Sequence, residues 1–341
     1  MPAEWAPHAA TWLAWPHNVA DWPGRFAPIP WVYAEIVRNV AAGERVNLLV
    51  NDAAGEKRAR GVLTRAGVSL ERVTFRRFRT DRIWTRDSGP IFVAGGGRKA
   101  IARFRFNAWA KYPNWKHDVK NPERAARALG LPLLPVVHGG REVVLEGGSI
   151  DVNGAGSILT TEECLLDPAV QVRNPGFARA DYQEVFARTL GAPNTIWLGK
   201  GIAGDDTHGH VDDLARFVSR RTIVLVREKD GKDPNHRPLE ENRERLQGAR
   251  LEDGTRPEVV ELPMPRPIVF DGQRLPASYA NFYVSNAATL VPTFDDPNDR
   301  VALGLLAELL PGRPVVGIHA LDLVWGLGTL HCLSQQEPEV G

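Results

Sequence analysis

A cysteine near the C-terminus is the most distinctive reactive side chain in this sequence. Cys332 is one of only 2 cysteines in the 341 residues, and it follows Gly326 and Gly328. Glycines at such positions indicate an unusual backbone conformation or the close approach of another group. A thiol in this setting is a candidate nucleophile, although most free cysteines are small buried hydrophobic residues. The position of Cys332 alone favours a buried structural role. The other polar segments of the chain favour a catalytic role.

The densest polar segment of the chain covers residues 205–213 and contains two histidines. If this segment is extended, His210 and Asp212 lie on the same side, because residues two apart in a strand share a face. Asp87 lies in another polar segment, Trp84–Pro90, where the simplest alternative is an aspartate that fixes its own turn. A third polar segment places Glu146 directly before two glycines. We expect these segments to converge on one cavity.

Two aspartates and a thiol suit chemistry on a guanidinium group. Carboxylates pair with planar guanidinium groups through two parallel hydrogen bonds, and Asp87 and Asp212 are candidates for that role. Cys332 would then attack the guanidinium carbon, and His210 would protonate the departing ammonia. Carboxylates near a thiol oppose its ionisation. We therefore expect thiolate formation to depend on the positive charge of the substrate or of His210.

The same polar segment has a metal-binding interpretation. The residues from His208 onward resemble the start of a binuclear metallohydrolase motif, in which imidazoles and carboxylates bind zinc. That motif requires a histidine where Asp213 stands, and further histidines downstream. Only His236, His319 and His331 follow, none in a comparable setting. The incomplete ligand set argues against a metal site.

Composition excludes several classes of protein. The chain is 43% hydrophobic and 24% charged, with a net charge of +1, so it has no overall field for nucleic acid or an anionic membrane. Two cysteines without paired spacing predict no disulfide framework, which is typical of the cytoplasm. The first residues lack the features of a signal peptide, and no apolar run is long enough to cross a bilayer.

A strand–helix–strand unit recurs roughly every 60 to 70 residues. The pattern predicts a closed, pseudo-symmetric α/β assembly, with an open doubly wound sheet as the alternative. Apolar spacing and capping residues predict helices at residues 31–42, 121–130, 178–190, 238–246 and 299–310. β-rich runs predict strands at residues 45–50, 195–198, 223–226, 259–262, 282–291 and 315–318. Asn121 and Asp296 are the expected helix caps.

Several of these segments together resemble the agmatine deiminase family, a branch shared with bacterial-type peptidylarginine deiminases. The resemblance runs in order from residue 1 to about residue 338, and as a set the motifs are highly specific. They are Met1–Trp5, Thr11–Pro16, Trp84–Pro90, Phe106–Trp109, Leu145–Ser149, Gly209–Asp212 and His331–Gln336.

The resemblance implies a five-bladed α/β propeller, the pentein fold, as a single catalytic domain of residues 1–341. Its site would lie in the central channel, without metal or organic cofactor. Cys332 would be the covalent nucleophile and His210 the acid and base. Asp87 and Asp212 would hold the guanidinium, and Glu146 would lie in the same wall.

Three further positions follow from the same resemblance. Asp206 falls on a substrate-binding position, Trp84 would flank the substrate, and Asn281 matches a polar position of the peptidylarginine branch. The implied partner is a small guanidino substrate, with neither nucleic acid nor membrane. A homodimer is left open.

Some residues depart from the agmatine pattern. Arg82 stands where an acidic residue is typical, and His208 where Asp or Asn is typical. Arg82, together with Arg76, Arg77 and Arg79, suggests a basic cavity entrance that prefers a guanidine bearing a carboxylate. The alternative is a strand face exposed to solvent, where runs of charged residues usually lie. The leading expectation is hydrolysis of agmatine to N-carbamoylputrescine and ammonia. The alternatives are another guanidino compound (an arginine-like acid or peptidyl-arginine), an amidinotransferase, or a propeller that only binds ligands.

Overall fold

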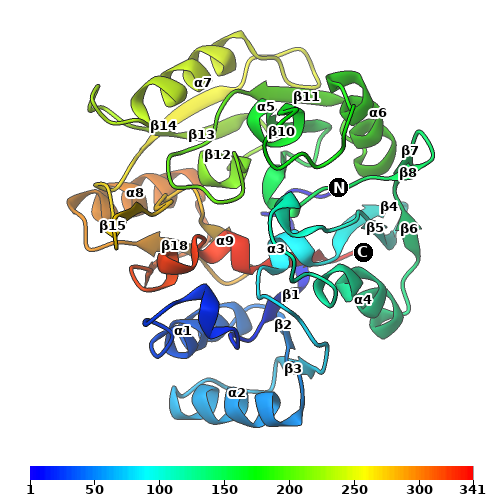
Figure 1. Ribbon diagram of the computed structural model, residues 1–341, viewed down its shortest axis with the longest axis vertical. Coiled ribbons are helices and arrows are strands. Elements are labelled where there is room, and N and C mark those ends of the chain that lie inside the picture. Colours follow the sequence, from blue (N-terminus) through cyan, green and yellow to red (C-terminus); the bar gives the residue numbers. More distant parts are fainter. Residues whose placement is uncertain (341) are drawn as a thin grey trace.

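The computed structural model describes residues 1–340 and shows a ring of small sheets with helices on the outside (Figure 1). The strands lie towards the middle of the view, and α2, α4, α6 and α7 lie at its periphery. No helix among the described residues is long and apolar enough to cross a membrane.

The first sheet shows the connection pattern that the others repeat. Its strands have the order β20-β1-β2-β3, with β20 antiparallel to β1 and the remaining pairs parallel. Their bounds are β1 His8–Ala14, β2 Arg45–Leu49, β3 Val73–Arg76 and β20 Gln335–Pro338. Because β20 pairs with β1, the two ends of the chain meet in one sheet, and Cys332 lies just before β20.

Four more sheets each contain an antiparallel pair followed by a parallel strand that is reached through a helix. Parallel neighbours need such a crossover, whereas the antiparallel pair needs only a short connection. The strands are β4 Ile91–Gly95, β5 Arg98–Arg103 and β6 Leu133–Pro135; β9 Asp151–Val152, β10 Ser157–Thr161 and β11 Asn194–Leu198; β12 Ala215–Phe217, β13 Thr222–Arg227 and β14 Glu258–Pro263; β17 Tyr283–Val284, β18 Thr289–Thr293 and β19 Val315–His319. Two hairpins complete the strands: β7 Val137–His138 with β8 Arg141–Glu142, and β15 Val269–Phe270 with β16 Gln273–Arg274.

Two helix ends show the capping residues that the sequence predicts. Asp296 accepts a hydrogen bond from the Asn298 backbone at the start of α8, and Gly130 ends α4 with a left-handed φ of 65°. The longer helices are α1 Ile29–Ala41, α2 Ala53–Arg65, α4 Asn121–Leu129, α6 Arg179–Leu190, α7 His236–Gly248 and α8 Pro297–Leu309. The short ones are α3 Thr85–Ser88, α5 Glu162–Leu166 and α9 Leu330–Leu333.

The predicted α/β class is confirmed, and three details of the prediction are wrong. The expected strand at residues 282–291 is two strands, β17 and β18, because Ser285 and Ala288 exchange hydrogen bonds across a turn. Asn121 is the first residue of α4 and not its cap. The alternative of one open doubly wound sheet does not hold, because the strands form separate small sheets.

Candidate active site

Four short elements converge near the middle of the molecule, and the predicted side chains lie in them or directly before them. α3 contains Asp87, α9 contains Cys332, the 3₁₀ helix Gly147–Ser149 follows Glu146, and the 3₁₀ helix Val211–Asp213 follows His210 and contains Asp212. α3 packs against α9 and Gly147–Ser149, which in turn packs against Val211–Asp213. The predicted catalytic residues therefore come from segments far apart in the sequence but adjacent in space.

Gly148 lies at the centre of this convergence. A Cβ atom at Gly148 would lie 2.5 Å from His210 Nδ1, 2.9 Å from Asp87 Oδ1 and 3.1 Å from Asp212 Oδ2. No other residue type fits there without displacing these three side chains. Gly148 therefore allows the side chains of His210, Asp87 and Asp212 to lie close together.

Asp87 is held at both carboxylate oxygens. The Gly148 N–H donates to Oδ1 at 3.0 Å, and Trp109 Nε1–H donates to Oδ2 at 2.9 Å. Burial, together with the neighbouring charges of Asp212 and Glu146, raises the pKa of Asp87 to about 6. A cation placed beside Asp87 would stabilise its ionised form.

Asp212 and Asp213 are adjacent in sequence, but their pKa values are shifted in opposite directions. Burial opposes ionisation of Asp212, but its contact with His331 Nδ1 at 2.6 Å outweighs burial and lowers the Asp212 pKa. Burial and the Asp212 charge raise the pKa of Asp213 well above its usual value. Asp212 Oδ1 is buried and has no hydrogen-bond partner among the described residues. Asp212 therefore presents a charged, unpaired oxygen to the site.

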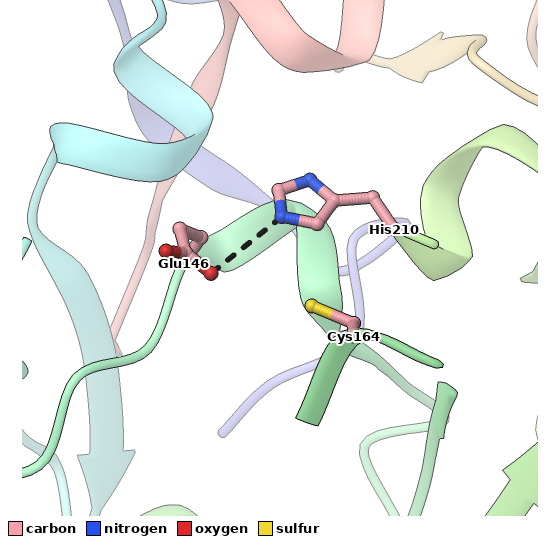
Figure 2. A group of neighbouring side chains, drawn as sticks. All are labelled: Glu146, Cys164 and His210. Carbon is pink, nitrogen blue, oxygen red and sulfur yellow. Dashed lines mark ion pairs between the residues drawn. The ribbon is translucent and has the colours of Figure 1, made fainter. Parts of the chain in front are cut away.

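His210 lies between two carboxylates. Its Nδ1 is 3.8 Å from Asp87 Oδ1, and its Nε2 is 3.6 Å from Glu146 Oε2 (Figure 2). Burial opposes a charged ring, but Asp87, Cys164 and Glu146 together raise the His210 pKa well above its usual value. Neither ring nitrogen has a hydrogen-bond partner among the described residues. A protonated His210 in this position is suited to donate a proton to a bound group.

Cys332 lies on the one-turn helix α9 and is 6% exposed. Its Sγ is 3.1 Å from Asn281 Nδ2 and 3.8 Å from Asp212 Oδ2. Burial and the charges of Asp212, Asp213 and Asp87 raise the pKa of the Cys332 thiol well above its usual value. The thiol is therefore neutral in the free protein at neutral pH.

The glycines before Cys332 are explained by close approach, not by left-handed torsions. A Cβ at Gly326 would lie 2.6 Å from the Trp22 ring, and one at Gly328 would lie 2.8 Å from the Trp84 ring. Leu327, between them, has the left-handed φ of 68°. The cysteine segment thus packs tightly on two tryptophans, whose ring centroids are 5.7 Å apart.

A cavity of about 140 Å³ leads from the surface to Cys332 and Asp87. Aromatic side chains form part of its wall, together with the charged residues Asp21, Arg82 and Asp206. The lining residues are Ala20, Asp21, Arg82, Trp84, Asp87, Trp109, Tyr112, Asp206, Thr207, Gly326, Leu327 and Cys332. Trp84 and Asp206, which the resemblance places beside a substrate, both line this cavity.

Asn281 also lies in the site, although it does not line the cavity. Its amide donates to Cys332 and, at 2.9 Å, to Asp213, and its Oδ1 accepts from the Thr329 hydroxyl at 2.7 Å. Glu146 is held by a buried ion pair with Arg173 at 3.1 Å. The structure thus brings all eight sequence-predicted residues to one region.

The prediction that His210 and Asp212 share one face of an extended segment is wrong. The segment is not extended: His210 precedes the 3₁₀ helix Val211–Asp213. The metallohydrolase motif also does not form one ligand set, because His208 turns away from His210 and pairs with Asp167 at 2.9 Å. The chain still has two sets of neighbouring metal-type ligands, Glu146–Cys164–His210 and Asp212–Asp213–Cys332.

The arginine-rich segment does not form one basic cavity entrance. Arg76 donates to Asn47, and the exposed Arg77 pairs with Glu56. Only Arg82 lines the cavity, and its charge is offset by Asp21, 3.1 Å away. The cavity entrance is therefore not strongly basic, because it contains only one of these arginines and that arginine is paired.

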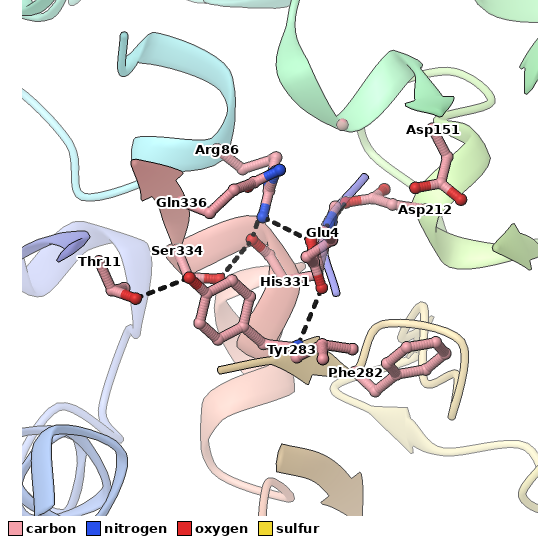
Figure 3. Close-up of polar contacts among 12 residues, drawn as sticks. Glu4, Thr11, Arg86, Asp151, Asp212, Phe282, Tyr283, His331, Ser334 and Gln336 are labelled. Carbon is pink, nitrogen blue, oxygen red and sulfur yellow. Dashed lines mark hydrogen bonds and ion pairs between the residues drawn. The ribbon is translucent and has the colours of Figure 1, made fainter. Parts of the chain in front are cut away.

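Sequence reasoning missed a buried network around Glu4 (Figure 3). Glu4 Oε2 contacts Arg86 Nη2 at 3.1 Å and His331 Nε2 at 2.8 Å. Glu4 Oε1 pairs with Arg216 at 3.0 Å and accepts the Val284 backbone N–H at 2.9 Å. Burial opposes ionisation, but Arg216 and His331 hold the Glu4 pKa well below its usual value. The only sequence signal was the location of Glu4 in the first family motif.

The network predicts a large loss of stability for Glu4→Ala. Arg86 and Arg216 would remain buried without their shared carboxylate, and removing one partner of a buried pair costs about 3–5 kcal/mol. Glu56→Ala, which removes the exposed pairs to Arg60 and Arg77, should cost about 1 kcal/mol or less. Urea unfolding of both variants measures the difference, and equal losses would contradict a structural role for Glu4.

Known proteins match this chain over nearly its whole length. The family model of the Porphyromonas-type peptidyl-arginine deiminases matches residues 1–338. The agmatine deiminase of Ectopseudomonas mendocina is 32% identical over 362 residues, covering 99% of this chain and 95% of the relative. Among solved structures, the agmatine deiminase of Enterococcus faecalis has a TM-score of 0.91 at 27% identity, covering 100% and 96% of the two chains. That of C. jejuni with substrate bound has a TM-score of 0.87 at 29% identity, with the same coverage.

The whole-length match defines the class: the chain belongs to the Porphyromonas-type peptidyl-arginine deiminase family. Within it, the relatives and structures named above are agmatine deiminases. The family resemblance read from the sequence motifs is thereby confirmed.

Proposed function

We propose that this protein is a deiminase that hydrolyses agmatine to N-carbamoylputrescine and ammonia. The observation that carries the proposal is a set of buried polar atoms that lack partners around one point: both ring nitrogens of His210 and Asp212 Oδ1, next to the Cys332 thiol. Buried polar atoms are normally hydrogen-bonded. A guanidinium group supplies N–H donors for the carboxylate and an electrophilic carbon for the thiol. The names of the relatives supply agmatine as the first candidate.

In the proposed mechanism, Asp87 and Asp212 hold the guanidinium by charge-assisted hydrogen bonds. The Cys332 thiolate attacks the guanidinium carbon, and the carbon–nitrogen bond to the terminal amino group breaks as His210 gives that nitrogen its proton. Ammonia leaves and a thiouronium group remains on Cys332. Neutral His210 then takes a proton from water, and the hydroxide attacks the same carbon. The thiolate departs, and the hydroxyl group left on the carbon loses its proton to solvent to give the ureido product.

Thiolate formation depends on the substrate in this proposal. The negative charges that raise the Cys332 pKa are the ones that bind the cation, so a bound guanidinium offsets them. A charged His210 acts in the same direction. The free protein therefore keeps a neutral, unreactive thiol, and the thiol loses its proton as the cation binds.

We also propose that the five repeated strand–helix–strand units form a five-bladed propeller with the cavity at its axis. The two chain ends close the ring through β20 and β1. Residues 1–341 would form one catalytic domain, and two free cysteines suit the cytoplasm. A homodimer remains compatible with this arrangement.

The function is tested by incubating the purified protein with agmatine, without added amine. Ammonia and N-carbamoylputrescine should appear in equal amounts, and a chelator should leave the rate unchanged. A requirement for an amine acceptor would instead indicate an amidinotransferase. Turnover of L-arginine without turnover of agmatine would make the substrate assignment wrong, and Arg82 would then be the first residue to suspect.

A further inference from the structure

Two acidic residues, Asp21 and Asp206, line the cavity that also reaches Cys332, and their carboxylate oxygens differ in the partners that they already have. Asp206 is engaged at both oxygens: Oδ1 pairs with Lys111, and Oδ2 accepts from the Tyr112 hydroxyl at 2.6 Å. Both carboxylate oxygens of Asp206 therefore already have a donor within the protein.

Asp21 has one oxygen left over. Its Oδ1 accepts from Asn18 Nδ2 at 3.2 Å and pairs with Arg82 Nη1 at 3.1 Å. Its Oδ2 is buried and has no hydrogen-bond partner among the described residues, and the side chain is only 2% exposed. Burial raises the Asp21 pKa to about 6 despite the Arg82 charge, as expected for a carboxylate that is incompletely paired.

The position of Asp21 is fixed by the packing of its neighbour. Asp21 ends the 3₁₀ helix Val19–Asp21, and Trp22 follows it with a fully buried ring that packs on Trp84. Trp84 lines the same cavity as Cys332. Asp21 is thus held against the aromatic wall of the cavity.

We propose that Asp21 Oδ2 binds the distal ammonium group of the substrate while the guanidino group lies at Cys332. An ammonium supplies the donor that this oxygen lacks, and the charge of the pair is favourable in a site shielded from water. The inference rests on the proposed deimination, and it assigns the role of substrate anchor to Asp21 in preference to Asp206. Arg82 holds Asp21 in place by pairing with the other carboxylate oxygen, Asp21 Oδ1.

The test compares agmatine with n-pentylguanidine, which has a methyl group in place of the ammonium. The ratio of kcat/KM for the two compounds cancels general effects on folding and on the chemistry. The wild-type protein should prefer agmatine, and Asp21→Asn should lower that preference by about 10- to 100-fold, the range for one charge-assisted hydrogen bond. Asp206→Asn should lower it less.

A double variant separates anchoring from charge compensation. Asp21→Asn alone leaves Arg82 uncompensated, and that charge repels a cationic substrate. If Asp21 anchors the ammonium, the preference stays low in Asp21→Asn/Arg82→Gln. If Asp21 only offsets Arg82, the double variant regains the preference and the proposal is overturned.

The two proposals fail in different ways. If the wild-type protein hydrolyses neither compound, the proposed deimination is wrong. If it hydrolyses both with equal kcat/KM, or if Asp21→Asn keeps the wild-type preference, deimination stands and the role of Asp21 is overturned.

Discussion

Cys332→Ala should lose deiminase activity by about 10⁴-fold or more while keeping its fold, because removal of a covalent nucleophile abolishes the pathway that it serves. The change is small and the Cys332 side chain lies at the end of a cavity, so little packing is lost. The measurement is ammonia release from agmatine, with circular dichroism and urea unfolding to compare folded structure.

The second cysteine provides a matched control. Cys164 is buried beside His210 and Glu146 (Figure 2). It does not line the cavity that reaches Cys332. Cys164→Ala should therefore keep measurable turnover, within about tenfold of the wild-type rate, because it removes no reacting atom and only one of the groups that raise the His210 pKa. Comparable losses in the two variants would contradict a specific role for the Cys332 thiol.

Asp212→Asn should lower kcat/KM for agmatine by about 10²- to 10⁴-fold, which reflects the loss of an ionised, desolvated partner for the guanidinium. Asp212 is fully buried, its pKa is lowered, and Oδ1 is unpaired. An asparagine keeps the shape but supplies one neutral acceptor. Steady-state kinetics with agmatine measures the effect.

Asp213 is the control for this change because it is the adjacent acid. Burial and the Asp212 charge raise the Asp213 pKa well above its usual value and so favour the protonated carboxyl group, which asparagine replaces with a neutral group of similar shape. Asp213→Asn should therefore change kcat/KM only a few-fold. A loss equal to that of Asp212→Asn would mean that charge at position 212 is not what binds the substrate.

Local sequence signals were sufficient to find the elements that carry the site. Prolines, capping aspartates and glycines marked most helices within a few residues, as for α8 after Asp296. Glycine-flanked polar segments marked Asp87, Glu146 and Cys332, because a site that gathers buried polar groups needs backbone without side chains, as at Gly148. Each signal was weak alone, and the ordered set of motifs supplied the specificity.

Other features depend on long-range contacts that no local pattern encodes. Glu4 joins Arg86, Arg216 and His331 from three distant segments, and nothing near Glu4 in the sequence indicates burial. The free oxygen of Asp21 is visible only because Arg82 and Asn18 occupy the other one. The geometry of His210 and Asp212 also differed from the expected strand, and their convergence comes from the packing of 3₁₀ helices.

The central claim is that the Cys332 sulfur bonds transiently to the substrate carbon. The most direct test is acid quenching of the protein during turnover of agmatine, followed by mass spectrometry of the intact chain and its peptides. We expect an added mass equal to the substrate minus ammonia, located on the peptide that contains Cys332 and absent from Cys332→Ala. Full turnover by Cys332→Ala, or an adduct on Cys164 instead, would contradict the account.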